Sequence, residues 1–181
     1  IRYAEGDLAR LIFHELAHQV AYAPGDTVFN ESFATAVERI GVQRWLAAHG
    51  SPAVREEYQR LEARREDFRA LTLRTRLTLD GIFRSDRPDA EKRAAKAEAM
   101  AAMRAEHEAL KAGPWGGFKG YDPWFERANN AALGVIGAYL ELVPRFEALF
   151  QAQGGDLDRF YAEVRRLAAL PQAERRATLG P

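Results

Sequence analysis

The chain has 181 residues, of which 47% are hydrophobic and 10% aromatic, and this is enough for a globular protein with a real core. Its 26 basic residues balance 26 acidic ones, so net charge gives no reason to bind nucleic acid or an anionic membrane. The absence of cysteine excludes thiolate zinc sites, a cysteine nucleophile and disulfide bonds. Any bound metal must therefore sit on His, Asp or Glu.

Within the sequence as given, no segment predicts a membrane span or a signal peptide. No apolar run approaches the ~20 residues of a membrane span, and residues 1–13 lack the charged-then-apolar order of a signal peptide. The chain lacks an initiator Met and reaches its most informative motif within the first 14 residues. We therefore expect it to be a part, or a processed form, of a longer protein.

Two helices are predicted in residues 1–52. Apolar residues recur at helical spacing from Asp7 to Ala21, with Asp7 as the expected N-cap. Turn residues follow at 24–26, and a second periodic stretch runs from Asn30 to about His49. The sequence thus predicts a helix, a short loop and another helix.

Residues 53–112 are rich in Arg, Glu, Ala and Leu, and they predict two long helices joined near residues 85–88 as an antiparallel hairpin. An apolar stripe supplies its buried face: Tyr58, Leu61, Phe68 and Leu71. The charged residues are expected to form a solvated face, because the interleaved acidic residues argue against a nucleic-acid surface.

Residues 113–181 begin with a glycine-rich loop, which fits no phosphate-binding spacing. Helices are expected at about 123–142, then from Pro144 through Phe150, and at about 156–170. No segment predicts a strand. We therefore expect a mainly α fold, in which one metallopeptidase domain covers residues 1–181, with zinc-site helices at 1–52, the hairpin at 53–112 and C-terminal helices that complete the cleft at 113–181.

The motif HELAH at residues 14–18 carries the chemistry. His14 and His18 are four residues apart, so in a helix both imidazoles project from one face and reach one ion. Glu15 lies beside the ion, where it can accept a proton from metal-activated water. Chance alone produces this spacing in about one per cent of chains of this length. The other two histidines, His49 and His107, fit no ligand spacing and are assigned to the surface.

A catalytic zinc site takes three protein ligands and leaves one position for water. Glu31 is the candidate for the third ligand. Two imidazoles and one carboxylate suit Zn²⁺ better than calcium or magnesium, although the same set also describes an iron site.

HELAH followed by NESFA at residues 30–34 resembles the zinc aminopeptidases of the gluzincin clan. That resemblance implies a zincin-like core with zinc held by His14, His18 and Glu31, and Glu15 as general base. The twelve residues between His18 and Glu31 are fewer than in thermolysin, and this shorter interval permits the same geometry if the two helices pack antiparallel.

The chain is more closely similar to a bacterial family of predicted aminopeptidases, on LIF at 11–13, PGDT at 24–27, NNA at 129–131 and Tyr139. This resemblance implies a periplasmic or cell-envelope protein, of which the chain is the C-terminal, metal-bearing portion. The sheet that roofs a gluzincin cleft would then lie in an upstream region.

Two residue assignments, those of the third metal ligand and of Asn30, have an alternative. Glu38 competes with Glu31 as the ligand because it lies seven residues further along nearly the same helical face, but the NESFA resemblance favours Glu31 and leaves Glu38 to support the ligands. Asn30 is either such a supporting residue or simply the N-cap of its helix.

Gluzincins add a Tyr or His that stabilises the oxyanion formed by attack on a peptide carbonyl. Tyr139 is preferred because it follows the NNA signature, ahead of Tyr121 and Tyr161.

The function that we expect is a zinc peptidase acting on a peptide substrate, with aminopeptidase action resting on the resemblance. The alternative is an envelope scaffold that binds through the hairpin and keeps a structural zinc site. The sequence leaves the cleavage mode and the oligomeric state open.

Overall fold

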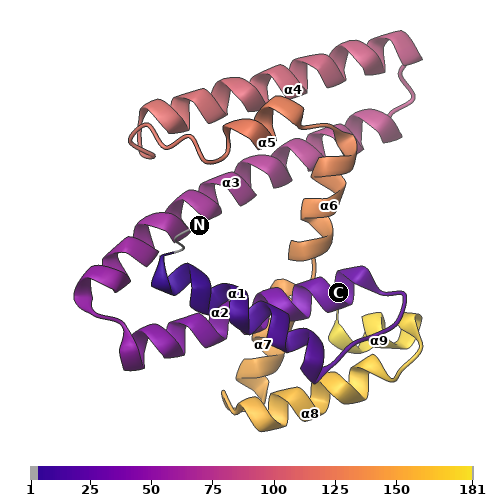
Figure 1. Cartoon of the computed structure of the whole chain (residues 1–181). Coiled ribbons are helices and arrows are strands. Elements are labelled where there is room, and N and C mark those ends of the chain that lie inside the picture. The colour runs from indigo at the N-terminus through magenta and orange to yellow at the C-terminus, as the bar shows by residue number, and fades with distance from the viewer. Residues whose placement is uncertain (1–3, 181) are drawn as a thin grey trace. The chain divides into compact units, whose positions relative to one another are not determined.

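The computed structural model describes residues 4–180, and in this range the chain forms only helices and loops, as the mainly α prediction requires (Figure 1). The helices are α1 (Glu5–Val20), α2 (Thr27–His49), α3 (Pro52–Arg84), α4 (Asp89–Ala112), α5 (Asp122–Arg127), α6 (Asn130–Leu140), α7 (Val143–Ala152), α8 (Leu157–Ala168) and α9 (Gln172–Leu179). None of these helices combines the length and apolar character that a membrane crossing needs.

The chain divides into two compact units. The first contains residues 1–59 and 138–181, and the second contains residues 60–137. Every predicted metal ligand lies in the first unit. The assignment of all 181 residues to one metallopeptidase domain stays a prediction, as does the upstream sheet.

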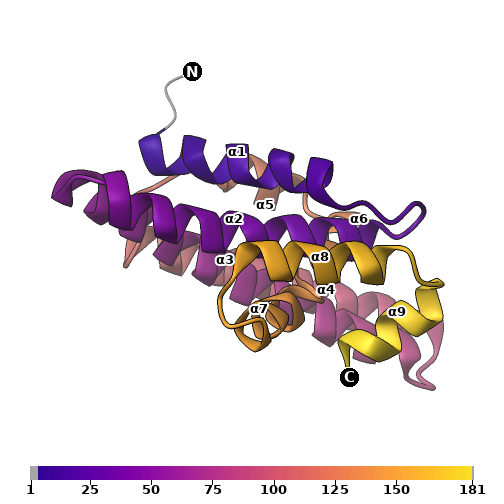
Figure 2. The ribbon, with the colours of Figure 1, turned by 90° about the horizontal axis from the view of Figure 1, so that it is seen from below.

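α1 and α2 form an antiparallel pair in the first unit, joined by a short loop, with α1 along one edge of the unit (Figure 2). They approach closely because α1 turns the small residues Ala9 and Ala17 toward α2, while its third buried position, Gly6, faces the Tyr58 ring of α3. On α2, a Cβ at Gly41 would lie 2.6 Å from the Phe13 ring, so that ring rests directly on the α2 backbone. Glycine at position 41 therefore permits the close approach that the site depends on.

The periodic apolar residues of α1 face outward instead. Leu8, Leu11, Ile12 and Leu16 are between 39% and 55% exposed. The periodicity therefore predicted the helix correctly but did not mark the face that packs on α2. Four large apolar residues exposed on one helix differ from the single exposed apolar residues that are normal on a protein surface.

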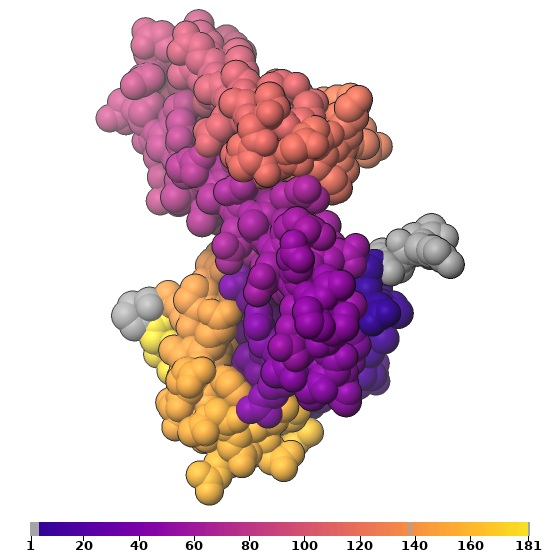
Figure 3. Space-filling model, turned by 90° about the vertical axis from the view of Figure 1, so that its left-hand side faces the viewer, coloured from indigo at the N-terminus to yellow at the C-terminus, as the bar shows by residue number. Residues whose placement is uncertain are grey.

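An aromatic core joins α2 to the C-terminal helices. The Phe146 ring of α7 lies 5.1 Å from Phe29 and 5.6 Å from Phe33, and Phe33 lies 5.9 Å from Phe160 of α8. All four rings are fully buried. In the space-filling view the atoms of α7 and α8 (orange) close directly against those of α2 (purple) (Figure 3). Residues 143–168 thus hold α2 in place from the side opposite α1.

The predicted starts of α1 and α2 are wrong, whereas α7 and α8 begin within one residue of the predicted positions. α1 begins at Glu5 after Ala4, which makes no side-chain cap, so Asp7 lies within the first turn and not at its N-cap. α2 begins at Thr27, and its N-cap is Asp26, whose side chain accepts a hydrogen bond from the Phe29 N–H at 3.1 Å. The sequence pattern predicts Asp26 as a turn residue, but Asp is common both in turns and at helix N-caps.

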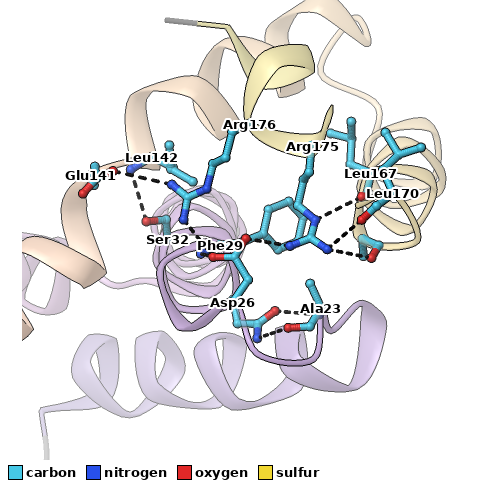
Figure 4. Close-up of polar contacts among 12 residues, drawn as sticks. Ala23, Asp26, Phe29, Ser32, Glu141, Leu142, Leu167, Leu170, Arg175 and Arg176 are labelled. Carbon is cyan, nitrogen blue, oxygen red and sulfur yellow. Dashed lines mark hydrogen bonds and ion pairs between the residues drawn. The ribbon is translucent and has the colours of Figure 1, made fainter. Parts of the chain in front are cut away.

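The helix α9 was not predicted, and it is anchored to Asp26 (Figure 4). Arg175 Nη1 lies 2.6 Å from one carboxylate oxygen of Asp26, and Arg176 Nη2 lies 2.8 Å from the other. Burial alone would raise the pKa of Asp26, but the Phe29 N–H and the two guanidinium groups outweigh it and hold that pKa below its usual range.

This lowered pKa predicts acid-sensitive stability. A carboxyl group whose pKa is lower in the folded state contributes stability above its unfolded pKa of about 3.9, and the contribution is lost as pH falls through the folded value. Urea unfolding should therefore show Asp26→Asn destabilised most near pH 7, with the gap to wild type narrowing below about pH 4. A gap that stays constant with pH would contradict this assignment.

The predicted hairpin is formed by α3 and α4, which are joined at residues 85–88, and from residue 60 onward it lies in the second unit. The buried face expected for α3 is present from Phe68 to Leu71, but α5 inserts between the arms, with Phe125 packing on both Phe68 and His107 (Figure 1). His107 is therefore buried, at 3% exposure, and its assignment to the surface was wrong, whereas His49 is exposed as expected.

The single helix expected at 123–142 is in fact two, α5 and α6, separated at residues 128–129. Asn129 marks the break because its side chain accepts a hydrogen bond from the Ala132 N–H at 3.1 Å, as an N-cap does. The break matters for the site because α6 carries Tyr139.

Candidate metal centre

The first helix places His14 and His18 on one face, with their Nε2 atoms directed at the same carboxylate of α2. His14 Nε2 lies 3.3 Å and His18 Nε2 3.9 Å from Glu31 Oε2. Ligand atoms of these three residues all lie within 4.8 Å of one another. All three residues are partly buried.

These distances fit a zinc ion. Bonds of about 2.0–2.2 Å at tetrahedral angles separate neighbouring ligand atoms by about 3.3–3.6 Å. The measured 3.3 Å matches one edge of such a tetrahedron, and the 3.9 Å edge needs a side-chain shift of only a few tenths of an ångström. Two imidazoles and one carboxylate form a donor set that suits Zn²⁺ and leaves one position open.

Glu38, the alternative ligand, lies on the other side of the His14 ring. Its Oε2 is 3.0 Å from His14 Nδ1, while its Oε1 accepts from Arg10 Nη1 at 2.5 Å. A carboxylate on Nδ1 fixes the tautomer that leaves Nε2 free to bind a metal. This geometry favours Glu31 as the ligand and Glu38 as the residue that orients His14.

The same contact affects protonation. The hydrogen bond that His14 donates to Glu38 raises the pKa of His14, burial opposes this rise, and the charges of Glu38, Glu31 and Glu15 add to it. Arg10 was not singled out from the sequence. The available signal was its position four residues before His14, on the same face of α1.

His18 has no corresponding partner. Within residues 4–180 its buried Nδ1 makes no hydrogen bond, and its ring packs edge-on against His14 at 5.1 Å and Tyr22 at 6.5 Å. The two histidines are thus held differently, His14 by a charged group and His18 by ring packing.

Glu15 is exposed and lies beside the ligands without bonding to one of them. Its negative charge contributes to the raised pKa values of both His14 and Tyr139. The carboxylate therefore lies near both groups, as a general base next to a metal should.

Tyr139 reaches this site from α6. Its ring stacks on His14 with the centroids 6.4 Å apart, and the residue is 38% exposed. Burial raises the pKa of its hydroxyl, and so do the charge of Glu31, a hydrogen bond to Glu31 and the charge of Glu15. The hydroxyl therefore stays protonated at neutral pH and is available as a donor beside the ligands.

The other two tyrosines considered as oxyanion donors lie in aromatic clusters. Tyr121 stacks on Phe68 at 4.4 Å in the second unit, and Tyr161 packs edge-on against Phe33 at 6.3 Å in the core of the first. Tyr139 is thus the one of the three candidates whose contacts include predicted ligands.

Asn30 is neither the N-cap of α2 nor a partner of a ligand. It is buried inside the helix, where its side chain accepts from the Ala23 N–H at 2.8 Å and donates to the Ala23 carbonyl at 2.9 Å. Its neighbour Ser32 accepts from the Leu142 N–H at 3.2 Å. These bonds tie the first turn of α2 to the preceding loop and to the segment that follows Tyr139.

A second cluster, in the other unit, also resembles a metal site. Ligand atoms of His107, Glu108 and Asp122 lie within 4.8 Å of one another. However, the Lys111 ammonium lies 2.7 Å from Glu108 Oε1 and 3.1 Å from Asp122 Oδ1, so the protein supplies its own cation there. Burial and the Lys111 charge lower the pKa of His107. We assign no metal to this cluster.

The ligand assignment predicts the effect of four substitutions. His14→Ala, His18→Ala and Glu31→Ala should each bring zinc well below one per chain, because each removes one of only three ligands. Glu38→Ala should keep one zinc per chain at saturation but weaken the affinity about 10- to 100-fold, since it releases the orientation of His14. Elemental analysis and chelator competition measure both quantities. Zinc lost from Glu38→Ala but retained by Glu31→Ala would reverse the assignment.

Comparison with known proteins adds one family. A family model described as "Putative aminopeptidase" matches residues 1–179. Searches of curated proteins and of solved structures returned no match.

Proposed function

Because the chain belongs to this "Putative aminopeptidase" family, we propose that it is a zinc-dependent peptidase that cleaves peptide bonds at the site formed by α1 and α2. The family description supports peptidase action, and the residues supply the mechanism. Aminopeptidase specificity, a gluzincin mechanism and a location in the cell envelope belong to the same proposal.

One observation carries this proposal. Three donors from two helices, His14 Nε2, His18 Nε2 and Glu31 Oε2, converge within a distance that one zinc ion spans. The charged supporting contact of Glu38 on His14 is typical of metal-binding histidines. A surface cluster of incidental charges would have no reason to fix the tautomer of one member.

The chemistry divides among the residues. Zinc at this site would supply Lewis acidity, which activates water and polarises the substrate carbonyl. Glu15 accepts the proton of the attacking water and passes it to the leaving amine. Tyr139 donates its hydroxyl hydrogen bond to the oxygen on which negative charge develops. Glu38 and Arg10 keep His14 in place and touch no reacting atom.

Hydrolysis of a fluorogenic library containing aminoacyl and internally quenched peptides tests the proposal. We expect turnover with the zinc-loaded protein, loss with chelator and recovery on adding zinc. Cleavage of aminoacyl substrates alone would support the aminopeptidase assignment, and cleavage of blocked peptides would favour an endopeptidase. A protein that binds zinc yet hydrolyses neither class, and whose Glu15→Gln variant behaves identically, would favour the scaffold alternative.

A further inference from the structure

The loop between α1 and α2 sets the geometry of the candidate metal centre. Two ligands, His14 and His18, precede this loop, and the third, Glu31, follows it in the first two turns of α2. Helix ends fray unless their free N–H and carbonyl groups are bonded. The position of Glu31 relative to the histidines therefore depends on what holds residues 20–30.

The C-terminal segment bonds both ends of this loop. At the end of α1, Arg165 of α8 donates to the Val20 carbonyl at 3.0 Å. At the start of α2, Arg175 and Arg176 of α9 share the two oxygens of Asp26 (Figure 4). Asp26 passes this restraint to the helix because it accepts from the Phe29 N–H, and its carbonyl accepts from the Asn30 N–H at 3.1 Å.

Arg175 is the rigid member of this arrangement. It is 5% exposed, and its guanidinium donates to the carbonyls of Leu167, Ala168 and Leu170 while lying 4.9 Å above the Phe29 ring. Because its other N–H groups donate to carbonyls at the C-terminal end of α8, the guanidinium is held in place independently of its ion pair with Asp26. Moving Asp26 would separate two buried opposite charges, which is costly.

We propose that Arg175 is a positioning residue for the metal centre: through Asp26 and the first turn of α2, it holds Glu31 at binding distance from His14 and His18. The proposal rests on the proposed zinc site. It gives α9 a role in metal affinity, although no residue of α9 is a ligand.

A purely structural Arg175 would behave differently. In that case its loss would lower the free energy of unfolding, but the molecules that remain folded would bind zinc with wild-type affinity. A positioning role requires weaker zinc binding by fully folded protein. The two roles are separated by measuring affinity in molecules shown to be folded.

The experiment compares zinc dissociation constants, by competition with a chelating dye, for the full chain with Arg175→Met, Arg175→Lys and Asp26→Asn. Val164→Ala is the matched control, because it removes two buried methyl groups from the same core and breaks no hydrogen bond or ion pair to residues 20–31. Circular dichroism at a temperature where every variant is folded accompanies each measurement. If Arg175→Met fails to fold, Arg175→Lys and Asp26→Asn carry the test.

We expect Arg175→Met and Asp26→Asn each to weaken zinc binding about tenfold, the lower end of the effects seen for residues that support ligands. Val164→Ala should stay within about twofold of wild type despite its lower stability. Arg175→Lys should recover only part of the loss, since one ammonium cannot replace the fork on Asp26 and the carbonyls. A variant that combines Arg175→Met with Asp26→Asn should bind zinc no more weakly than the weaker of the two single variants, because both substitutions break the same Arg175–Asp26 contact.

The positioning role would be overturned if Asp26→Asn and a folded Arg175 variant, either Arg175→Met or Arg175→Lys, each bound zinc with wild-type affinity. The proposed zinc site itself would then remain intact. Equal weakening in Val164→Ala would also overturn it, because general loosening of the core would then explain the effect. A wild-type protein that binds no zinc would instead refute the site itself, and the inference with it.

Discussion

Glu15→Gln is expected to keep one zinc per chain and to lose at least about 100-fold in turnover. The substitution replaces the proton acceptor by an amide of the same size, and general acid–base groups typically contribute 10²–10⁴-fold. The ligand atoms of His14, His18 and Glu31 are untouched, since Glu15 makes no bond to any of them. Zinc content is measured by elemental analysis, and turnover is measured on the best substrate of the peptide library.

A matched control lies on the same helix. Glu5→Gln removes the same charge from an exposed position at the start of α1, away from the ligands, and should leave both zinc and turnover unchanged. Full activity of Glu15→Gln would rule out this residue as the base. Loss of activity together with loss of zinc would mean that Glu15 acts on the metal and not on the water.

Local patterns predicted the helices well, because they depend on residues close in sequence. The periodicity of residues 7–21 and the i, i+4 spacing of His14 and His18 both describe one face of one helix. Which face packs inward depends on tertiary structure. The buried face of α1 consists of Gly6, Ala9 and Ala17, and the large apolar residues from Leu8 to Leu16 lie on the exposed face.

Long-range partners explain the remaining errors. His107 was assigned to the surface because nothing near it in sequence suggests burial, but Phe125, eighteen residues later, covers its ring at 3.9 Å. Asp26 is held by Arg175, 149 residues away, and no spacing rule links the two. Glu38 and Glu31 share a helical face, so only the position of α1 against α2 distinguishes the residue on Nδ1 of His14 from the one near Nε2.

The family resemblance supplied what spacing could not. It favours Glu31 and Tyr139, and both side chains lie near the His14 ring in the structure. The resemblance could not supply Arg10 or Arg175, because their contacts depend on how this chain packs its own charged residues.

Tyr139→Phe is the test of the oxyanion donor. The substitution deletes one hydroxyl and almost no volume, and the ring can keep its stacking on His14. A donor that acts mainly in the transition state should affect turnover more than substrate binding. We therefore expect a barrier higher by roughly 2.7–4 kcal/mol, which corresponds to about 10²–10³-fold in kcat, with little change in KM.

Zinc affinity and thermal stability should change little, because Tyr139 is 38% exposed and its hydroxyl is not one of the predicted metal ligands. Tyr22→Phe is the control: its ring also lies against a predicted ligand, 6.5 Å from His18, but the residue is 60% exposed. If the hydroxyl of Tyr139 only steadies Glu31, Tyr139→Phe should weaken zinc binding while turnover per bound zinc survives. A loss of kcat at full zinc occupancy, absent from Tyr22→Phe, would identify Tyr139 as the group that meets the developing charge.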